Sequence, residues 1–398
     1  MAGETPCPTQ RGLGKRMHRP LEFVSLFSGA GGLDLGFELA GWQCLYASDI
    51  DRYACATLEA NRASLINRTR VMCEAVIRCE DVRGLGGSDI LSAIDRQRGE
   101  VPLLLGGPPC QTWSSAGHQL GFEDPRGRLF ADFVRIAAEL DVRWIVFENV
   151  RGLLTARGPD GKPGSALQHI RSVLLEAGYQ TVVELLNAAD FGVPQRRVRL
   201  FIIGFRPGDV QPSFPKPTHQ KSPPADLRAS PWVSMRSALC RIDPVREDEV
   251  IFPSPGLADQ LEKLSPGSGV KSPGKAEATR PGGHWGYKQG AFLADLDLPS
   301  RTVTASPQQD WIRDQRQRIR RLTPRECAAL QSFPSTWKFE ARRSVEYRLI
   351  GNAVPPLLAK ALEPIQEEWI HVQGLGLVNR LSMRRIMARR TNAATLVA

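Results

Sequence analysis

Short apolar segments alternate with amphipathic ones along the first half of the chain. Continuous aliphatic and aromatic runs predict buried β-strands, and apolar positions spaced three and four residues apart predict helices with one buried face. The predicted strands are 23–27, 44–49, 101–105 and 143–150, then a pair at 181–191 and 197–205. The predicted helices are 31–40, 52–61, 128–140 and 166–179. This alternation predicts an α/β fold with a doubly wound, Rossmann-like sheet.

The pattern changes after residue 206. Twelve of the 30 prolines fall within residues 207–273, and few periodic segments lie between them, so we predict an inserted, loop-rich second domain. Helical periodicity returns at 323–333, where Thr323 is the predicted N-cap, Pro324 takes the first helical position and Glu326 completes a capping box. A further helix is predicted at 355–369. The predicted organisation is a tail at 1–20, a catalytic part at 21–206, the inserted domain at 207–317, a return to the catalytic part at 318–372 and a basic tail at 373–398.

The charge of the chain predicts a polyanionic partner. Lysine and arginine exceed aspartate and glutamate by 52 − 42 = 10, and the pI is about 9.4. Such an excess is more typical of proteins that bind nucleic acid than of those that bind membranes. The sequence has no apolar signal core and no run long enough to span a membrane, and its eight cysteines include no CxxC pair. We therefore expect a cytoplasmic protein (with the nucleoid, in a bacterium), free thiols and no metal site.

The segment "LLLGGPPCQTWSSAG" at 103–117 places a cysteine just after the end of a predicted strand. Two glycines end the predicted strand and two prolines restrict the backbone that follows. Cys110 should therefore lie at the carboxyl edge of the sheet, where open α/β sheets bind their ligands. A free cysteine can also be a small buried hydrophobe, so the segment alone leaves a packed thiol and a nucleophile open.

The segment "LFSGAGGLDLGF" predicts a glycine-rich turn between a strand and a helix. Gly29 and Gly31 match the opening of a dinucleotide fingerprint, but Asp34 stands where the third glycine belongs. Asp49, 20 residues after Gly29, could bind ribose hydroxyls, with Ile50 against an adenine ring. Asp81 could accept a hydrogen bond from the adenine amino group. Together these residues predict an adenosine-type cofactor and leave NAD and S-adenosylmethionine open.

Acidic and basic side chains follow the later strands. Glu148 ends an apolar strand, where burial would raise its carboxyl pKa and let it act as an acid near neutral pH. Arg197 and Arg199 are two residues apart, so they should share one face of a strand. Two guanidinium groups there would lower the pKa of a nearby thiol and bind anionic or carbonyl groups. Each residue alone also fits an ordinary structural role.

Six segments in order closely resemble the motif series of the DNA (cytosine-5) methyltransferases, specifically the bacterial restriction–modification type. They are "LFSGAGG", "GGPPCQTWS", "FENVRGLL", "DFGVPQRRVRLFIIG", "RLTPRECAALQSFP" and "YRLIGNAVPP". The resemblance spans about residues 21–366, apart from the proline-rich insert, which stands where this family has its target-recognition domain. It implies an S-adenosylmethionine-dependent methyltransferase domain with a smaller recognition domain inserted.

The resemblance also implies roles for individual residues. Cys110 would add to carbon 6 of a flipped cytosine, Glu148 would hold and protonate ring nitrogen 3, and Arg199 would contact the base carbonyl with Arg197 as its companion. Carbon 5 would then take the methyl group of S-adenosylmethionine. The implied cofactor-binding residues are Phe27, Gly29, Gly31, Asp49, Ile50, Asp81, Val82, Pro108, Asn352, Ala353 and Val354.

Duplex DNA is the implied partner. A restriction endonuclease that acts on the same DNA sequence is a second implied partner. A solitary regulatory methyltransferase without such an endonuclease fits the resemblance equally well. A monomer is expected. The candidate DNA contacts are Gln111, Ser114, Arg236, His284, Trp285, Tyr287, Lys288, Arg301 and Thr302. The segment 62–78, longer and more basic than the family leads us to expect, and the arginine-rich tail have no predicted role.

Three alternatives to this interpretation remain. An NAD-dependent oxidoreductase would explain the glycine turn, but not the missing third glycine or the set Cys110, Glu148 and Arg199. A DNA-binding protein without activity would need no nucleophile. RNA cytosine-5 methyltransferases usually present two catalytic cysteines in a different arrangement.

Overall fold

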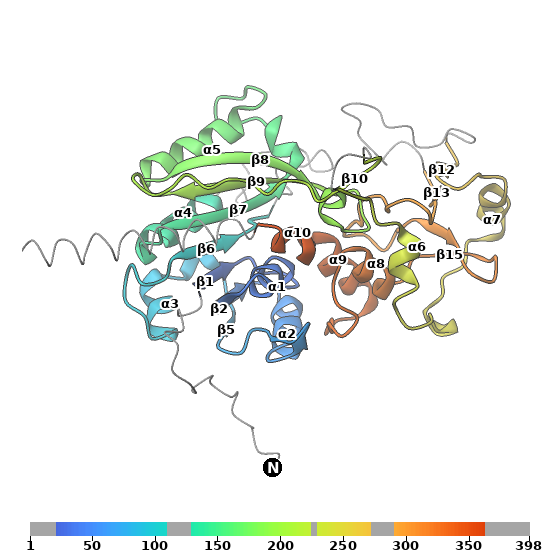
Figure 1. Ribbon diagram of the computed structural model, residues 1–398, viewed down its shortest axis with the longest axis horizontal. Coiled ribbons are helices and arrows are strands. Elements are labelled where there is room, and N and C mark those ends of the chain that lie inside the picture. The colour runs from blue at the N-terminus through green and yellow to red at the C-terminus, as the bar shows by residue number, and fades with distance from the viewer. Residues whose placement is uncertain (1–20, 110–128, 224–228, 272–289, 363–398) are drawn as a thin grey trace, which may run out of the picture.

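A seven-stranded sheet forms the centre of the computed structural model, which describes residues 21–109, 129–223, 229–271 and 290–362 (Figure 1). In spatial order its strands are β5 (Val76–Cys79), β2 (Trp42–Asp49), β1 (Leu21–Leu26), β6 (Leu103–Gly106), β7 (Trp144–Val150), β9 (Val198–Phe205) and β8 (Gln180–Asn187). The first five run parallel, and β9 lies antiparallel to both of its neighbours. The predicted doubly wound α/β fold is confirmed, and the predicted strand pair forms its antiparallel edge.

Helices cover both faces of this sheet, which explains the continuous apolar strands. Alternate residues of β6 enter different cores: Leu103 and Leu105 belong to one hydrophobic cluster and Leu104 to the other. The first cluster contains side chains of α1 (Gly32–Leu39), α2 (Arg52–Ala60) and α10 (Pro356–Lys360). The second contains side chains of α3 (Gly87–Ala93), α4 (Leu129–Leu140) and α5 (Ser165–Glu176). Short 3₁₀ turns are η1 (Val82–Gly84), η4 (Arg151–Leu154), η5 (Ala188–Phe191) and η6 (Glu247–Glu249).

The strand order places the switch in winding direction between β1 and β6. Leu26 pairs with Gly106, and Gly106 pairs with Phe147 of β7. The three residues lie side by side in neighbouring strands, so the segments that follow them leave the same edge of the sheet together. Ligands of open α/β sheets bind at such a switch point.

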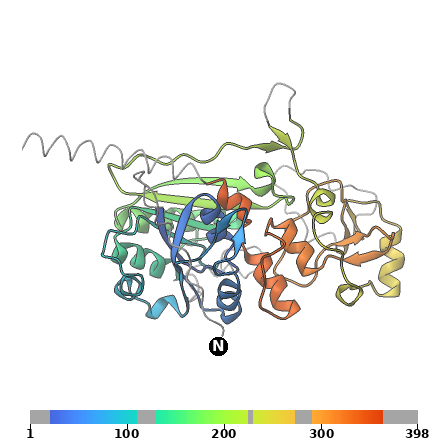
Figure 2. The same ribbon diagram turned by 60° about the horizontal axis from the view of Figure 1, so that its bottom comes forward.

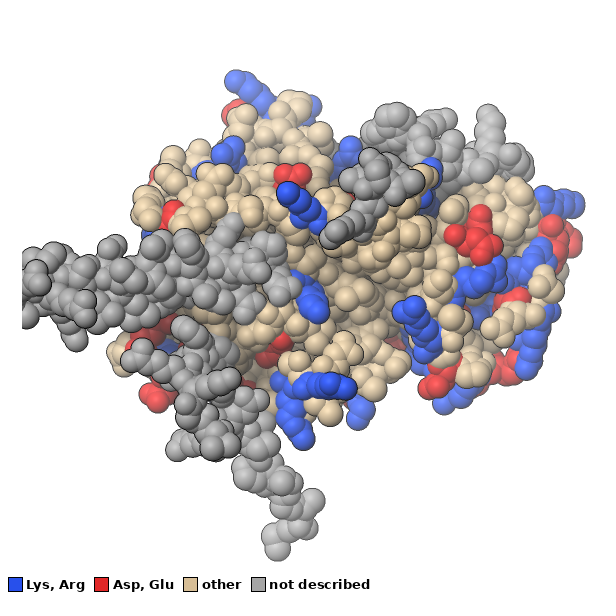
Figure 3. Space-filling model, in the orientation of Figure 1, with Lys and Arg blue, Asp and Glu red and all other residues tan. Residues whose placement is uncertain are grey.

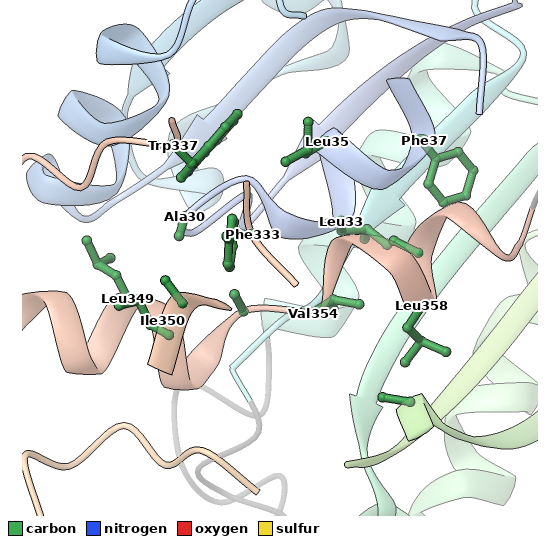
Figure 4. Close-up of a cluster of buried hydrophobic side chains, with 14 of the residues drawn as sticks. Ala30, Leu33, Leu35, Phe37, Phe333, Trp337, Leu349, Ile350, Val354 and Leu358 are labelled. Carbon is green, nitrogen blue, oxygen red and sulfur yellow. The ribbon is translucent and has the colours of Figure 1, made fainter. Parts of the chain in front are cut away.

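Helices α1 and α10 pack unusually closely (Figure 4). A Cβ atom on Gly36 would lie 2.6 Å from the Pro356 carbonyl oxygen, 2.7 Å from the Lys360 nitrogen and closer still to the Ala359 side chain. Figure 4 shows Leu33 of α1 beside Val354 and Leu358 from the C-terminal part of the fold. Side chains from the C-terminal part of the chain thus pack against α1, the first helix of the fold.

We expect Gly36→Ala to destabilise the protein. Helix propensity alone would favour alanine by about 1 kcal/mol, but the new methyl group overlaps backbone atoms of α10, and such overpacking typically costs about 1–3 kcal/mol. Gly256 in α7 (Pro255–Glu262) is a matched control, because a Cβ there would meet nothing within 4 Å. Urea denaturation should show a lower midpoint for Gly36→Ala and an equal or higher one for Gly256→Ala. Equal midpoints for Gly36→Ala and the wild type would contradict the close packing.

The proline-rich insert lies beside the sheet (Figures 1 and 2) and contributes Met235, Phe292 and Ile312 to the first hydrophobic cluster. Its core contains Leu261, Leu264, Leu293, Trp311 and Ile319. The elements are β10 (His219–Gln220), β11 (Ser230–Pro231), α6 (Met235–Leu239), α7, β12 (Ser268–Gly269), β13 (Phe292–Leu293), β14 (Trp311–Arg313) and β15 (Ile319–Arg321). The last four strands make one sheet, so this sheet continues beyond residue 317, where we placed the end of the insert.

The chain then returns to the main sheet through α8 (Pro324–Leu330) and α9 (Arg343–Asn352). The predicted capping box at α8 is confirmed: the Thr323 side chain accepts a hydrogen bond from the Glu326 amide, and the Glu326 carboxylate accepts one from the Thr323 amide. Helix α9 was not predicted. The helix predicted at 355–369 is described only as α10 and a turn to residue 362, because later positions lie outside the described residues.

The segment 62–78 contains a small hairpin, β3 (Leu65–Ile66) and β4 (Thr69–Arg70), before it enters β5. Buried Glu38 of α1 fixes the segment by accepting hydrogen bonds from the Met72 amide (2.6 Å) and the Cys44 amide (3.1 Å). Burial raises the pKa of Glu38 to about 8. Because β5 pairs with β2, Asp81 does follow the third strand of the parallel sheet, as predicted. None of the helices in the described ranges is both long and apolar enough to cross a bilayer.

Candidate active site

The turn after β1 has an unusual backbone. Phe27, Gly29 and Gly31 all have positive φ values, of 57°, 56° and 76°. Such a conformation is strained for phenylalanine, and strain of this kind persists mostly at functional sites. A Cβ on Gly31 would lie 2.6 Å from the Leu58 side chain, whereas Gly29 has no atom within 4 Å of its Cβ position. The turn therefore leaves open space above Gly29 and leads directly into the N-terminus of α1, an end of a helix that favours negatively charged groups.

Asp49 and Ile50 lie beside this turn. The Asp49 carboxylate accepts hydrogen bonds from the Gly29 amide and the Asp51 amide, both at 2.8 Å. Burial raises the pKa of Asp49. The side chain of Ile50 is 66% exposed, which is unusual for isoleucine and leaves it free to lie against a flat apolar ring. These positions fit the predicted ribose and adenine contacts.

Asp81 and Val82, the next two predicted cofactor residues, differ in exposure to solvent. Asp81 caps η1 by accepting a hydrogen bond from the Arg83 amide, and its hydrogen bonds with the Arg83 side chain lower the pKa of its carboxyl. It is therefore an ionised acceptor at the surface. Val82 is buried in the second hydrophobic cluster, which leaves its backbone rather than its side chain for a ligand.

The loop between α9 and α10 closes over the glycine turn. A Cβ on Gly32 would overlap the carbonyl oxygen of Val354. Ala353 is buried, and Asn352 is exposed at the end of α9. The structure thus brings residues 352–354 to the turn, more than 300 residues away in the sequence, as the resemblance implied.

Glu148 and Arg199 form a buried ion pair at the same edge of the sheet. The Arg199 Nε atom lies 3.0 Å from the Glu148 Oε1 atom, and the two side chains are 13% and 11% exposed. Burial raises the pKa of Glu148, and the guanidinium groups of Arg199 and Arg197 offset part of that rise. A carboxyl with a raised pKa and a guanidinium held beside it can supply a proton and hydrogen bonds to a polar ring.

The segment that leads to Cys110 passes this pair. A Cβ on Gly107 would lie 3.1 Å from the Glu148 Oε2 atom, and the Asn149 side-chain amide donates a hydrogen bond to the Pro108 carbonyl at 3.3 Å. The end of β7 therefore anchors residues 107 and 108. Cys110 follows Pro109 directly in the sequence but lies outside the described residues, together with the predicted DNA contacts Gln111 and Ser114.

Three comparisons with known proteins agree with this geometry. The sequence matches the family of C-5 cytosine-specific DNA methylases over residues 21–364. The chain belongs to this family. It is 32% identical to the Type II methyltransferase M.FnuDI of Fusobacterium nucleatum over 85% of this chain and 92% of that protein. It is 35% identical to the Type II methyltransferase M.PspPI of a Psychrobacter species, over 86% and 78% of the two chains. The solved structure of the Dnmt2 methyltransferase of S. pombe has the same fold, with a TM-score of 0.60, 17% identity and coverage of 88% and 99%.

Arg197 has a different environment from the one expected for this methylase. Its side chain is 1% exposed and donates hydrogen bonds to the Val303 carbonyl (3.0 Å) and the Gly351 carbonyl (2.7 Å). It therefore joins the end of the insert to α9, while Arg199 makes the close ion pair with Glu148. Sequence spacing placed the two arginines on one face but could not show that the first is bound by distant carbonyls.

A buried glutamine pair, which the sequence analysis missed, completes this connection. The Gln195 amide donates to the Gln331 side chain at 2.8 Å, and its oxygen accepts from the Val303 amide at 2.9 Å. Gln331 in turn donates to the carbonyls of Ile350 (2.6 Å) and Ala353 (3.3 Å), which flank Asn352. Gln331 belongs to the segment "RLTPRECAALQSFP", so the resemblance contained a signal for it.

We expect Gln331→Leu to lower the stability of the methylase by about 2–4 kcal/mol, because the Gln195 amide and the carbonyls of Ile350 and Ala353 would each lose one buried hydrogen bond. The midpoint of urea denaturation measures the loss. Exposed Gln308 supplies the control, since Gln308→Leu removes the same group where water can replace it. A Gln331→Leu protein as stable as the control would contradict the role given to the pair.

The predicted DNA contacts of the insert are partly engaged within the protein. Arg236 forms an exposed ion pair with Asp297 at 2.7 Å. Arg301 is mostly buried, pairs with Asp310 and stacks on the Phe292 ring, so its prediction as a free DNA contact is not supported. The Thr302 hydroxyl donates to the Arg196 carbonyl. Figure 3 shows mixed basic and acidic side chains over the small sheet. The other predicted contacts lie outside the described residues: His284, Trp285, Tyr287 and Lys288.

Proposed function

We propose that this methylase transfers a methyl group from S-adenosylmethionine to carbon 5 of a cytosine within a specific duplex DNA sequence. The observation that carries the proposal is the buried Glu148–Arg199 pair beside residues 107 and 108, which lead directly into Cys110. An acid, a guanidinium and a thiol on adjacent segments are the groups that covalent activation of a pyrimidine requires.

In the proposed reaction the Cys110 thiolate forms a bond to carbon 6 of the cytosine. Glu148 donates its proton to ring nitrogen 3, which neutralises the charge that develops as the sulfur adds. Arg199 donates hydrogen bonds to the base carbonyl and keeps the Glu148 carboxyl in place. The ring then carries electron density at carbon 5, where it takes up the methyl group. Loss of the carbon 5 proton to solvent pushes the thiolate off carbon 6, and the proton on ring nitrogen 3 returns to Glu148, which restores the aromatic base and the free enzyme.

The residues around the glycine turn fit the adenosine-containing methyl donor. The open space at Gly29, the Asp49 carboxylate and the exposed Ile50 would receive the methionine, ribose and adenine parts in that order. Asn352 and the loop over Gly32 would close the site from the other side. Bound there, S-adenosylmethionine supplies an electrophilic methyl group on a sulfonium.

The target atoms of cytosine lie inside the base stack of duplex DNA, so the base must leave the helix to reach Glu148. The two curated relatives described above are both named Type II methyltransferases. We therefore propose that this chain protects DNA as the modification enzyme of a restriction–modification pair, with a restriction endonuclease that acts on the same sequence.

Incubation of the purified protein with plasmid DNA and S-adenosylmethionine, followed by bisulfite sequencing, tests this proposal. We expect protected cytosines at one recurring sequence and none without the cofactor. The same assay identifies the recognition sequence. Complete bisulfite conversion of plasmid DNA that carries many different sequences would contradict the proposed activity.

A further inference from the structure

Asp34, in the first turn of α1, is a fully buried carboxyl that forms none of the ion pairs found in the described residues. Its side chain is 0% exposed. Within the described part of the chain, neither carboxylate oxygen makes a hydrogen bond of normal geometry. Burying an unpaired carboxylate is costly, so native proteins rarely retain one unless it has a function. Asp34 also occupies the position at which a dinucleotide fingerprint would have its third glycine.

The surroundings of Asp34 contain no compensating cation. The Ser25 and Ser28 hydroxyls lie beside it and are 3.0 Å from each other. Asp49 at the end of β2 adds a second negative charge. None of the ion pairs in the described residues includes Asp34. Burial raises the pKa of Asp34 to about 6, while the hydrogen bonds of the Ser25 hydroxyl, the Asp34 amide and the Ser28 hydroxyl favour its ionised form.

Glu38, one turn further along α1, is a buried carboxyl with a clear structural role, and its hydrogen bonds can be compared with those of Asp34. It faces the same side of α1, but it accepts hydrogen bonds from the Cys44 and Met72 amides. These bonds fix the segment 62–78 and explain why Glu38 is buried. Asp34 has as neighbours only groups of its own turn and of β1, namely its own amide and the hydroxyls of Ser25 and Ser28, and Ser28 belongs to the turn between Phe27 and Gly29. The free charge therefore lies next to the turn that the proposed function assigns to the methionine part of the cofactor.

We propose that Asp34 is a specificity-determining residue that makes the cofactor site prefer the cationic methyl donor to its neutral product. The inference rests on the proposed use of S-adenosylmethionine. When the methyl group leaves, the electron pair of the S–CH3 bond stays on sulfur, so the sulfonium becomes a neutral thioether. The amino, carboxylate and adenosine groups are the same in both molecules. A buried carboxylate is poorly screened, so it attracts the sulfonium and exerts no such attraction on the thioether. Release of S-adenosylhomocysteine is favoured as a result.

The test compares two dissociation constants in two proteins. Asp34→Asn removes the charge and keeps the size of the side chain. Titration calorimetry without DNA gives Kd for S-adenosylmethionine and for S-adenosylhomocysteine. We expect the variant to bind S-adenosylmethionine about tenfold more weakly and S-adenosylhomocysteine within about twofold of the wild type, as loss of one partly screened charge interaction predicts. Product inhibition of methyl transfer should become correspondingly stronger.

Glu38→Gln is the control for structural effects, since it replaces a buried carboxyl of the same helix face by its amide. It should lower stability and leave the ratio of the two dissociation constants unchanged. Equal weakening of both ligands by Asp34→Asn would show a purely structural role and overturn the inference, as would an unchanged ratio. If Asp34→Asn does not fold, Asp34→Ser is measured in the same way. A wild-type protein that binds neither nucleoside would overturn the proposed function as well, so the two failures are distinguishable.

Discussion

Cys110→Ser is expected to abolish methyl transfer to DNA and to leave the affinity for the cofactor within about twofold of the wild type. A serine hydroxyl is ionised far less than a cysteine thiol at neutral pH, so it cannot add to carbon 6 of the ring. The cofactor contacts proposed here lie on the glycine turn, the end of β2 and the loop after α9, all far from residue 110 in the sequence. Loss of a covalent nucleophile typically lowers kcat on the order of 10⁴-fold or more.

Transfer of the labelled methyl group of S-adenosylmethionine to plasmid DNA measures this loss, and calorimetry measures cofactor binding. Cys240→Ser is the control, because Cys240 is an exposed thiol that donates only to the Ser237 carbonyl, a bond that serine can keep. We expect full activity from it. Turnover by Cys110→Ser at more than a few per cent of the wild-type rate would refute the covalent mechanism.

Glu148→Gln should reduce kcat by about 10²–10⁴-fold, the usual contribution of a general acid. Glutamine can still donate a hydrogen bond, but it cannot transfer a proton to ring nitrogen 3. The substitution also leaves the buried guanidinium of Arg199 without its counter-charge. Because burial raises the pKa of Glu148, its protonated form is present closer to neutral pH than that of an ordinary glutamate. We therefore expect the wild-type rate to fall as pH rises through that pKa.

Single-turnover rates across a range of pH, with DNA and cofactor saturating, test this prediction. The variant should be slow at every pH, and its rate should lack the decrease at high pH that we assign to ionisation of Glu148. Glu184→Gln serves as the control, since Glu184 is exposed on the edge strand β8 and should be replaceable without loss of rate. A Glu148→Gln enzyme with the wild-type pH profile would rule out the proposed proton donor.

The parallel sheet and the glycine turn could be predicted from the sequence because their signals are local. Apolar runs such as 143–150 fill both faces of the sheet, and positive φ at Gly29 and Gly31 needs glycine wherever the chain goes afterwards. The capping box at Thr323 was predicted for the same reason, since all of its atoms belong to four consecutive residues.

Other features of the site depend on contacts that no local pattern contains. Arg197 and Arg199 look equivalent at a spacing of two, yet only the structure shows Arg197 bound to the carbonyls of Val303 and Gly351. Arg301 looks like a free cation until Asp310 and Phe292 are placed around it. Helix α9 has only weak amphipathic periodicity, so no local signal predicted it. The burial of Asp34 likewise becomes visible only once α1 lies on the sheet.

Trapping with duplex DNA that carries 5-fluorocytosine at the target position tests the central claim most directly. Fluorine cannot leave as a proton does, so an enzyme that adds its sulfur to carbon 6 and methylates carbon 5 should remain bound to the DNA. We predict a cofactor-dependent complex that survives denaturation, and peptide mass spectrometry should locate the linkage at Cys110. Absence of any such complex at the correct site with cofactor present, or a linkage at another residue, would contradict the account.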